Sequence, residues 1–240
     1  MDLSIVIPAF EENKKIAGDI ESAAAFLQNQ RLQGEIIVVD DGSEDHTSEA
    51  AKSAAVPPQV NLKVIRYKPH RGKGFAVRTG INQTQGRYAM FADSGSTVPY
   101  KNALRGLELI KSGVCDIAHG SRKMKGCHIQ KAQSLYRHIC SKLFHWYVAH
   151  YVGVPAEFTD TQCGFKVYKG EVARRMYGEC VTEGFAFDIE IVMRAQKEGY
   201  RIKEFPVDWT CDRDSRLSPS RSLWRTFSEL ANIKRIVSKK

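Results

Sequence analysis

Acidic residues stand directly after two apolar segments of this chain. Asp40 and Asp41 follow the run Ile-Ile-Val-Val at 36–39, and Asp93 follows the run at 88–92. Apolar runs of this length are typical of buried parallel strands, and open α/β sheets bind ligands beyond the carboxyl ends of such strands. Carboxylates brought to one such edge could bind the hydroxyls of a sugar or ribose, or a metal ion on a diphosphate.

A nucleotide sugar needs a slot for its base, a carboxylate for its ribose, and cations, a metal ion or backbone N–H groups for its diphosphate. Residues 8–12 (Pro-Ala-Phe-Glu-Glu) follow the first apolar run and could supply the slot and a carboxylate. Lys73 lies between two glycines in Arg-Gly-Lys-Gly, and glycine permits a close backbone approach to a ligand. Asp93 could hold a divalent metal ion that bridges the two phosphates.

Strands and helices must alternate along the chain to position these residues. Apolar runs predict strands at 3–8, 35–40, 61–66, 88–92, 116–120 and 201–207. Apolar residues at helical spacing and capping residues predict helices at about 11–30, from 43–47 onward, and at about 75–84, 100–112 and 186–197. This alternation is typical of an α/β fold with a doubly wound, mostly parallel sheet.

The second half of the chain contains segments of a different character. Residues 122–133 are basic and predict a loop. Residues 133–152 predict a helix with an aromatic face, which would either pack in the core or meet lipid. Residues 220–240 predict an amphipathic helix with a basic tail, so we expect one domain over 1–217 and a C-terminal amphipathic basic helix over 218–240.

Bulk composition limits the classes of protein to which the chain can belong. Its 240 residues suit one large α/β domain, and its net charge of +9 indicates a basic surface, a phosphate-bearing partner or an anionic membrane. Six cysteines without a Cys-x-x-Cys pair argue against a zinc site. The absence of a signal peptide and of an 18-residue apolar run favours a cytosolic protein without a membrane span.

Eight short segments of this chain resemble known motifs, and they occur in a characteristic order. They are IVIPAFEEN, IIVVDDGSEDHT, RGKGFAVRTG, GRYAMFADS, HGSR, DTQCGFKVY, GFAFDIE and EFPVDW. The set, which covers about residues 3–217, resembles family 2 glycosyltransferases of the GT-A fold. The last four segments resemble especially the polyprenyl-phosphate (dolichyl-phosphate) glucosyltransferases and mannosyltransferases, and residues 160–166 look most like the glucosyltransferase branch.

The resemblance implies a donor site for a nucleoside-diphosphate sugar. Its residues would be Pro8, Ala9, Phe10, Glu12, Asp41, Lys73, Asp93 and Ser94. Asp93 matches the first acid of the family's DxD metal motif, whereas Gly95 replaces the second acid. Mg²⁺ or Mn²⁺ could bind with water and diphosphate completing the shell, could bind weakly, or could be unnecessary.

The resemblance also implies a site for the phosphate of the acceptor. Arginine suits such a site, because its guanidinium is planar, bidentate and always charged. The acceptor-phosphate residues would be Arg122, Arg137, Ser141, Arg213 and Arg216, and the catalytic residues Asp93, Arg122 and Arg137. Asp160, Gln162, Asp188 and Glu190 are candidates for contact with the sugar, although Asp188 and Glu190 could instead stabilise the first turn of a helix.

These residues together predict an inverting glycosyltransferase at the cytosolic face of a membrane. It would move a hexose, with glucose and UDP favoured, to a polyprenyl phosphate, and would meet the membrane peripherally or through a membrane-protein partner. A soluble, glycan or protein acceptor is the alternative, and a sugar-nucleotide-binding subunit without turnover is another, motivated by Gly95. A nucleic-acid partner is not expected, because no recognition motif accompanies the basic residues.

Overall fold

A seven-stranded sheet forms the centre of the molecule. The computed structural model describes residues 1–127, 147–155, 157–210 and 229–237. The strand order is β3-β2-β1-β4-β6-β5-β7, and β6 alone among these strands runs antiparallel to its neighbours. The strands are β1 (Leu3–Ala9), β2 (Gly34–Asp40), β3 (Asn61–Arg66), β4 (Tyr88–Ala92), β5 (Ile117–Ser121), β6 (Phe165–Lys169) and β7 (Ile202–Pro206). The predicted doubly wound, mostly parallel sheet is therefore confirmed.

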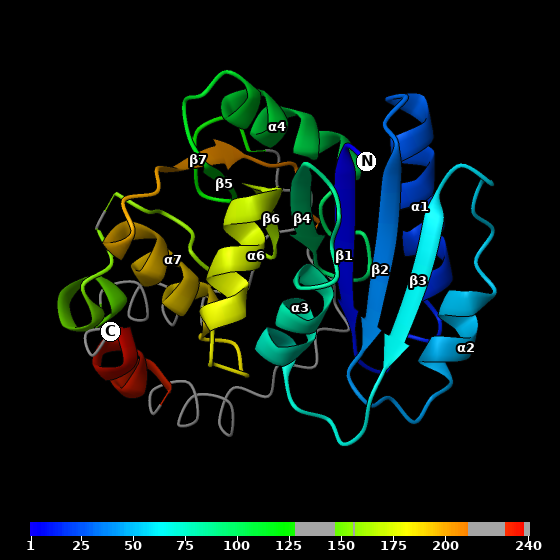
Figure 1. Cartoon of the computed structure of the whole chain (residues 1–240), viewed down its shortest axis with the longest axis horizontal. Coiled ribbons are helices and arrows are strands. Elements are labelled where there is room, and N and C mark those ends of the chain that lie inside the picture. Colours follow the sequence, from blue (N-terminus) through cyan, green and yellow to red (C-terminus); the bar gives the residue numbers. More distant parts are fainter. Residues whose placement is uncertain (128–146, 156, 211–228, 238–240) are drawn as a thin grey trace.

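Helices cover both faces of the sheet (Figure 1). The first face is covered by α1 (Ile16–Asn29), α2 (Thr47–Lys52) and α4 (Ala103–Lys111), which follows the short 3₁₀ turn η1 (Tyr100–Asn102). The second face is covered by α3 (Lys73–Ile81), α6 (Gly170–Glu179) and α7 (Phe187–Lys197), together with the π-helical turn η2 (Val148–Val152). Residues 133–146 of the predicted aromatic helix lie outside the described residues.

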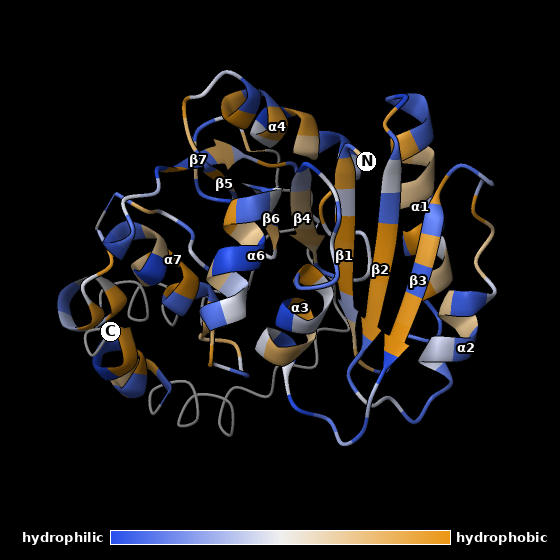
Figure 2. Ribbon diagram, viewed as in Figure 1, coloured by the Kyte–Doolittle hydropathy of each residue, from blue (hydrophilic) through white to orange (hydrophobic). Residues whose placement is uncertain are grey.

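Alternate side chains of each central strand pack against opposite helical layers. On β1, Ile5 and Ile7 belong to the first apolar cluster and Val6 to the second, and all three are fully buried. This burial on both faces explains the continuous apolar runs of the sequence, one of which appears in orange along β2 in Figure 2. Because β1, β2, β4 and β5 are mutually parallel, their carboxyl ends meet at one edge of the sheet, hereafter the carboxyl edge.

The sequence analysis did not predict β6 and α6. Strand β6 carries Lys166 and Lys169 within five residues, so it lacks the apolar run that identifies the other buried strands. Because β6 is antiparallel, its amino end lies at the carboxyl edge, and the loop that precedes it meets the carboxyl ends of β4 and β5.

Residues 229–237 are helical and pack into the second apolar cluster (red in Figure 1). Leu230 and Ile233 are fully buried there, and the ammonium group of Lys197 donates to the carbonyl oxygen of Val237 at 2.7 Å. In this part of the predicted C-terminal helix, the apolar stripe therefore contacts protein. Among the described residues, no helix is long and apolar enough to cross a membrane.

Candidate active site

The loops that follow β1 and β2 are bound to each other at the carboxyl edge. Three consecutive backbone N–H groups, those of residues 11–13, donate to side-chain oxygens of the loop at 43–47. The acceptors are Ser43 Oγ at 2.8 Å, Thr47 Oγ1 at 2.8 Å and Asp45 Oδ2 at 3.1 Å. Pro8 and Ala9 lie buried in β1, Glu12 is half-buried, and Phe10 is exposed. The motifs around these residues are therefore parts of one surface.

The two adjacent acids at the end of β2, Asp40 and Asp41, have different roles. Asp40 is fully buried and accepts hydrogen bonds from the Ser43 backbone at 2.9 Å and from Ser48 Oγ at 2.5 Å. Arg66 Nε lies 3.5 Å from its carboxylate. Asp40 therefore holds the turn that leads into α2.

Asp41 holds the turn that leads into α3. Its carboxylate accepts from the backbone N–H groups of Arg71 and Gly72, each at 2.8 Å, and lies 2.9 Å from His70 Nδ1. The ring of Phe10 packs on the His70 ring with the centroids 4.1 Å apart. Asp41 and Phe10 thus both contact His70. The exposed ring of Phe10 could stack on a planar base.

The glycines on either side of Lys73 make close contact with the protein's own backbone. A Cβ atom on Gly72 would lie 2.6 Å from the carbonyl oxygen of Glu183, and one on Gly74 would lie 2.6 Å from that of Thr182. The sequence led us to expect a ligand phosphate close to these two glycines, but the backbone of the loop at 182–184 occupies that space. This loop clamps the start of α3 and fixes the position of Lys73.

Lys73 reaches the acid at the end of β4. Its Nζ atom lies 2.6 Å from Asp93 Oδ1. Burial alone would lower the pKa of Lys73, but the carboxylates of Asp93 and Asp188 outweigh that effect and raise this pKa. The Lys73 side chain therefore remains protonated at neutral pH.

Gly164 lies against the carboxylate of Asp93. The Asp93 backbone N–H donates to the Gly164 carbonyl at 2.8 Å, and a Cβ atom on Gly164 would lie 2.0 Å from Asp93 Oδ2. The glycine in the segment at 160–166 is thus required by the position of Asp93. Ser94, the next residue, is half-buried.

A second ion pair lies beneath the first. Lys166 Nζ lies 2.8 Å from Asp188 Oδ1 and donates to the Cys163 carbonyl at 2.7 Å. The Lys166 side chain is fully buried and that of Asp188 is 3% exposed. Burial raises the pKa of Asp188, although the two nearby lysine charges oppose the increase. Asp188 is thereby placed behind the carboxyl edge, as a counter-ion to Lys166 and near Lys73.

Arg122 follows β5 and pairs with Asp160. The guanidinium donates through Nε at 2.6 Å and through Nη2 at 2.8 Å to the two carboxylate oxygens of Asp160. Although burial opposes the ionisation of Asp160, hydrogen bonds from Arg122 lower its pKa. Glu204 on β7 accepts from the backbone N–H of Asp160 at 2.8 Å and so fixes this loop. One edge of the guanidinium is thus occupied, and within the described residues its other N–H groups make no hydrogen bond, which leaves them for a ligand.

The other predicted residues have different positions. Glu190 is fully buried and accepts from the Thr182 backbone at 2.8 Å and from Arg194 Nε at 2.7 Å, so it stabilises the 182–184 loop from below. Gln162 Nε2 is buried without a hydrogen-bond partner in the described part of the chain. The remaining acceptor-phosphate candidates, Arg137, Ser141, Arg213 and Arg216, lie outside the described residues.

Asp19 on α1 is a buried acid that sequence reasoning missed. It is 1% exposed and accepts hydrogen bonds from Ser96 Oγ at 2.6 Å and from the Tyr100 hydroxyl at 3.3 Å. Gly95 and Ser96 have φ angles of 89° and 50°, so the loop after Asp93 turns through the left-handed region directly above Asp19. The sequence could not predict the contact of Asp19 with Ser96 and Tyr100, because Asp19 stands among apolar residues of a helix and the loop lies far away in the chain.

Asp19 should make stability depend on pH. Burial raises its pKa from 3.8 to about 6. The folded state therefore holds a proton that the unfolded state releases, and the contribution of Asp19 to stability falls as pH rises from about 4 to 6, by on the order of 3 kcal/mol. An Asp19→Asn variant lacks this titration. The unfolding free energy of the variant minus that of wild type should therefore be about 3 kcal/mol larger at pH 7.5 than at pH 4. Urea unfolding at both pH values measures this, and equal differences at the two pH values would contradict it.

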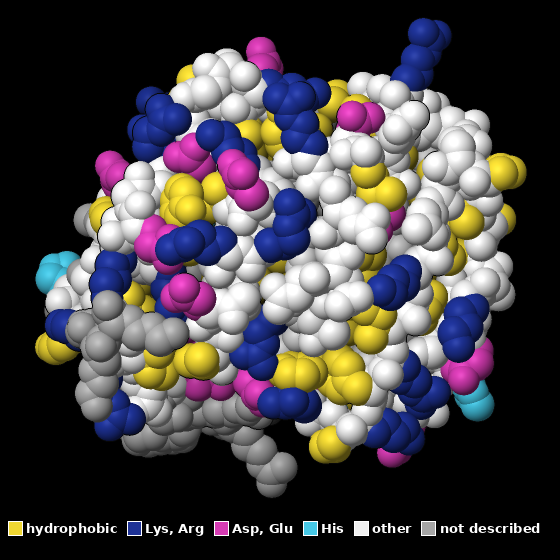
Figure 3. All heavy atoms as spheres, in the orientation of Figure 1, with side chains coloured by type: hydrophobic (Ala, Val, Ile, Leu, Met, Phe, Trp, Pro, Cys, Tyr) yellow, Lys and Arg dark blue, Asp and Glu magenta, His cyan; other side chains and the backbone are white. Residues whose placement is uncertain are grey.

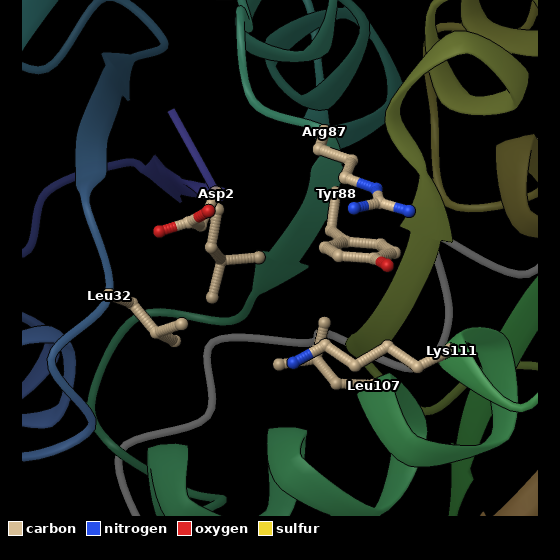
Figure 4. Close-up of a pocket in the computed structure, with 7 residues that line it drawn as sticks. Asp2, Leu32, Arg87, Tyr88, Leu107 and Lys111 are labelled. Carbon is tan, nitrogen blue, oxygen red and sulfur yellow. The ribbon is translucent and has the colours of Figure 1, made fainter.

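A separate cavity of about 260 Å³ lies at the amino ends of β1 and β4, away from the carboxyl edge (Figure 4). Arg87 and Lys111 flank the ring of Tyr88 there, 5.5 and 5.7 Å from its centroid. On the face shown in Figure 3, basic, acidic and apolar side chains are interspersed. None of the predicted donor residues lines this cavity, and they lie instead at the carboxyl edge.

Comparison with known proteins identifies the family. The sequence profile of Glycosyl transferase family 2 matches residues 4–176. The chain belongs to this family. It is 31% identical to the dolichyl-phosphate beta-glucosyltransferase of Dictyostelium discoideum, over 97% of this chain and 73% of that protein. Its identity to the Homo sapiens protein of the same name is 32%, over 90% of this chain and 70% of the other.

Solved structures of low sequence identity share the fold. Glucosyl-3-phosphoglycerate synthase from Mycobacterium tuberculosis, in complex with Mn²⁺, UDP-glucose and phosphoglyceric acid, has a TM-score of 0.73 at 16% identity, covering 98% of this chain and 80% of that chain. The same enzyme has also been solved with Mg²⁺ and UDP, with a TM-score of 0.66 at 15% identity, covering 98% of this chain and 75% of that chain. The GT-A-like fold expected from the sequence is thus confirmed, and the chain is a family 2 hexosyltransferase related to dolichyl-phosphate glucosyltransferases.

Proposed function

We propose that this chain transfers glucose from UDP-glucose to a polyprenyl phosphate. The observation that carries the proposal is that the turn at Gly72 and Lys73 connects the acid that follows β2 with the acid that follows β4. Asp41 binds the backbone of Gly72, and the next residue, Lys73, binds Asp93. A donor lying along this turn would meet an aromatic face at Phe10 and a cation at Lys73. The relatives' names support the glucosyl group and the lipid phosphate acceptor.

The donor would bind in an extended arrangement along the carboxyl edge. The Phe10 ring and the Asp41 turn would receive the base. Glu12 and Ser94 lie on the flanking loops and would face the ribose and the phosphates. Gln162 Nε2, which has no partner within the described residues, would donate to a sugar hydroxyl. Asp160 and Asp188 would act through the cations that they hold.

The acceptor chemistry needs little proton transfer. A phosphate monoester has its second pKa near 6, so its oxygen is already an anionic nucleophile at neutral pH. That oxygen would attack the anomeric carbon of glucose from the side opposite the leaving diphosphate. A new carbon–oxygen bond forms as the old one breaks, and the configuration inverts. Positioning and charge stabilisation would supply the catalysis, with Arg122 facing the acceptor phosphate.

The same role as Arg122 is proposed for Arg137, Ser141, Arg213 and Arg216. Contact with the membrane would be peripheral, on the cytosolic face, and either direct or through a membrane-protein partner. The fold neighbours contain Mn²⁺ or Mg²⁺ beside UDP, and in this chain a metal ion would have to bind at Asp93. The described residues contain no cluster of three side chains suited to a metal ion, and Asp93 Oδ1 already lies 2.6 Å from Lys73. This donor set does not fit a divalent cation.

A transfer assay tests the proposal. Purified full chain is mixed with radiolabelled UDP-glucose and short-chain polyprenyl phosphate in detergent, and label is counted in the organic extract. An Arg122→Ala variant serves as the inactive control. We expect lipid-extractable glucose with the wild type, and less with UDP-galactose, UDP-N-acetylglucosamine or GDP-mannose. If label reaches only a soluble acceptor, such as a phosphorylated acid or a glycan, the proposed lipid acceptor is wrong and the alternative of a soluble, glycan or protein acceptor is favoured.

Replacing Gly164 with alanine tests whether the position of Asp93 matters. The new Cβ atom must displace the Asp93 carboxylate, because it would lie 2.0 Å from Oδ2. We expect kcat/KM for transfer to fall roughly 10- to 100-fold, since small misplacements of site groups are costly. Gly178→Ala on α6 is the matched control, because nothing lies within 4 Å of its added Cβ atom. Equal activity of the two variants would show that the contact is unimportant.

A further inference from the structure

The acid of the metal motif in this chain already has a cation. In the sequence, glycine stands at position 95 where a second acid is expected, so Asp93 is the single carboxylate of the motif. In the structure, Asp93 Oδ1 lies 2.6 Å from the Lys73 ammonium group. A carboxylate oxygen engaged by an ammonium group is a poor ligand for Mg²⁺ or Mn²⁺, because the metal must first displace the lysine.

Lys73 is held firmly in this place. Its side chain is 19% exposed, and the glycines on either side of it are packed against the backbone at 182–184. Lys73 is also the first residue of α3, where the positive end of the helix dipole adds to its charge. Its ammonium group has three N–H donors, so Asp93 leaves donors for a second anion.

We propose that Lys73, rather than a divalent metal ion, neutralises the donor diphosphate in this chain. The inference rests on the proposed function for the identity of the donor as a UDP sugar. Lys73 would hold one phosphate oxygen in the bound donor and would stabilise the additional negative charge that the leaving UDP acquires. Asp93 keeps the ammonium group directed at this position, and the Lys166–Asp188 pair lies beneath it.

The two possible roles of Asp93 predict opposite results for one variant. If Asp93 is a metal ligand, Asp93→Asn removes the ligand and UDP binding is lost. If Asp93 is the counter-ion of Lys73, the same change frees the ammonium group, so UDP binding without metal is retained or becomes tighter. Lys73→Met should weaken UDP binding roughly 10- to 100-fold, the range for a lost hydrogen bond to a charged group.

Isothermal titration calorimetry of the full chain with UDP, in EDTA and in MnCl₂, tests this proposal. Lys169→Met is the matched control, because it breaks an equally short pair, Lys169 to Asp116 at 2.6 Å, at the opposite end of β6. We expect wild type and Lys169→Met to bind UDP with affinities that differ less than about threefold between EDTA and MnCl₂. Thermal melting of each variant confirms that it is folded.

Three results would overturn the proposal: wild-type binding of UDP only with Mn²⁺, loss of UDP binding in Asp93→Asn, or unchanged binding in Lys73→Met. Failure of the proposed function has a different signature. If Lys73-dependent binding of UDP occurs in EDTA but no glucose reaches the lipid extract, the inference stands and the acceptor assignment fails. If UDP binds under neither condition, both fail.

Discussion

Asp188→Leu should lower the free energy of unfolding by about 3–5 kcal/mol, the cost of leaving one member of a buried ion pair without its partner. Lys166 is fully buried on β6, and its ammonium group lies 2.8 Å from Asp188. Without that carboxylate, the Lys166 ammonium keeps only the Cys163 carbonyl as a described hydrogen-bond partner. Urea unfolding at pH 7 measures the loss.

The double variant Lys166→Met with Asp188→Leu separates the cost of an unpaired charge from the cost of altered packing. Because both charges are removed together, it should recover most of the stability lost in Asp188→Leu. Lys169→Met breaks a pair of which the lysine side chain is 35% exposed, so it should cost less than about 1 kcal/mol. A double variant as unstable as the sum of its single variants would contradict the expected coupling.

The sheet was predictable because most of its strands are buried on both faces. The runs at 36–39 and 88–92 contain no charged residue that would hide the pattern, so each strand and the edge at which it ends could both be identified. Strand β6 was missed for the opposite reason. Lys166 is fully buried within it, and a lysine is buried only when a distant partner such as Asp188 neutralises it. That partner is 22 residues away in the sequence and cannot be inferred from local pattern.

The gathering of Asp41, Lys73 and Asp93 at one edge of the sheet was predictable, but several contacts of the candidate site residues were not. Gly72 and Gly74 indicated a close approach, and the structure shows that the approaching group is the chain's own backbone at 182–184. Arg122 and Asp160 were assigned to two different ligands, whereas the structure pairs them with each other. Spacing along the chain carries no information on such pairings, because they depend on how β5, β6 and β7 lie in the sheet.

Replacing Arg122 with alanine should reduce kcat/KM for transfer roughly 100- to 1000-fold, the effect typical of losing a group that stabilises charge in the transition state. Arg122→Lys should restore little activity, since an ammonium group cannot bind Asp160 with two parallel hydrogen bonds and also face a phosphate. UDP affinity should change little in either variant, because Arg122 is proposed to face the acceptor. A large loss of UDP affinity would place Arg122 in the donor site instead.

Loss of Arg122 should also destabilise the protein, and the effect should depend on pH. Asp160 is 3% exposed, and Arg122 lowers the pKa of its carboxyl in the folded state. This contribution to stability is present at neutral pH and is lost as pH falls and Asp160 becomes protonated. The unfolding free energies of wild type and Arg122→Ala should therefore differ by about 3 kcal/mol at pH 7 and converge towards pH 3.

A double variant, Arg122→Met with Asp160→Leu, separates catalysis from folding. Removing both charges should restore most of the stability at pH 7, because no unpaired charge remains buried. Activity should stay as low as in Arg122→Ala, since no guanidinium faces the acceptor. If activity returned together with stability, Arg122 would only hold the loop at Asp160, and the phosphate would have to be bound by other cations of the chain.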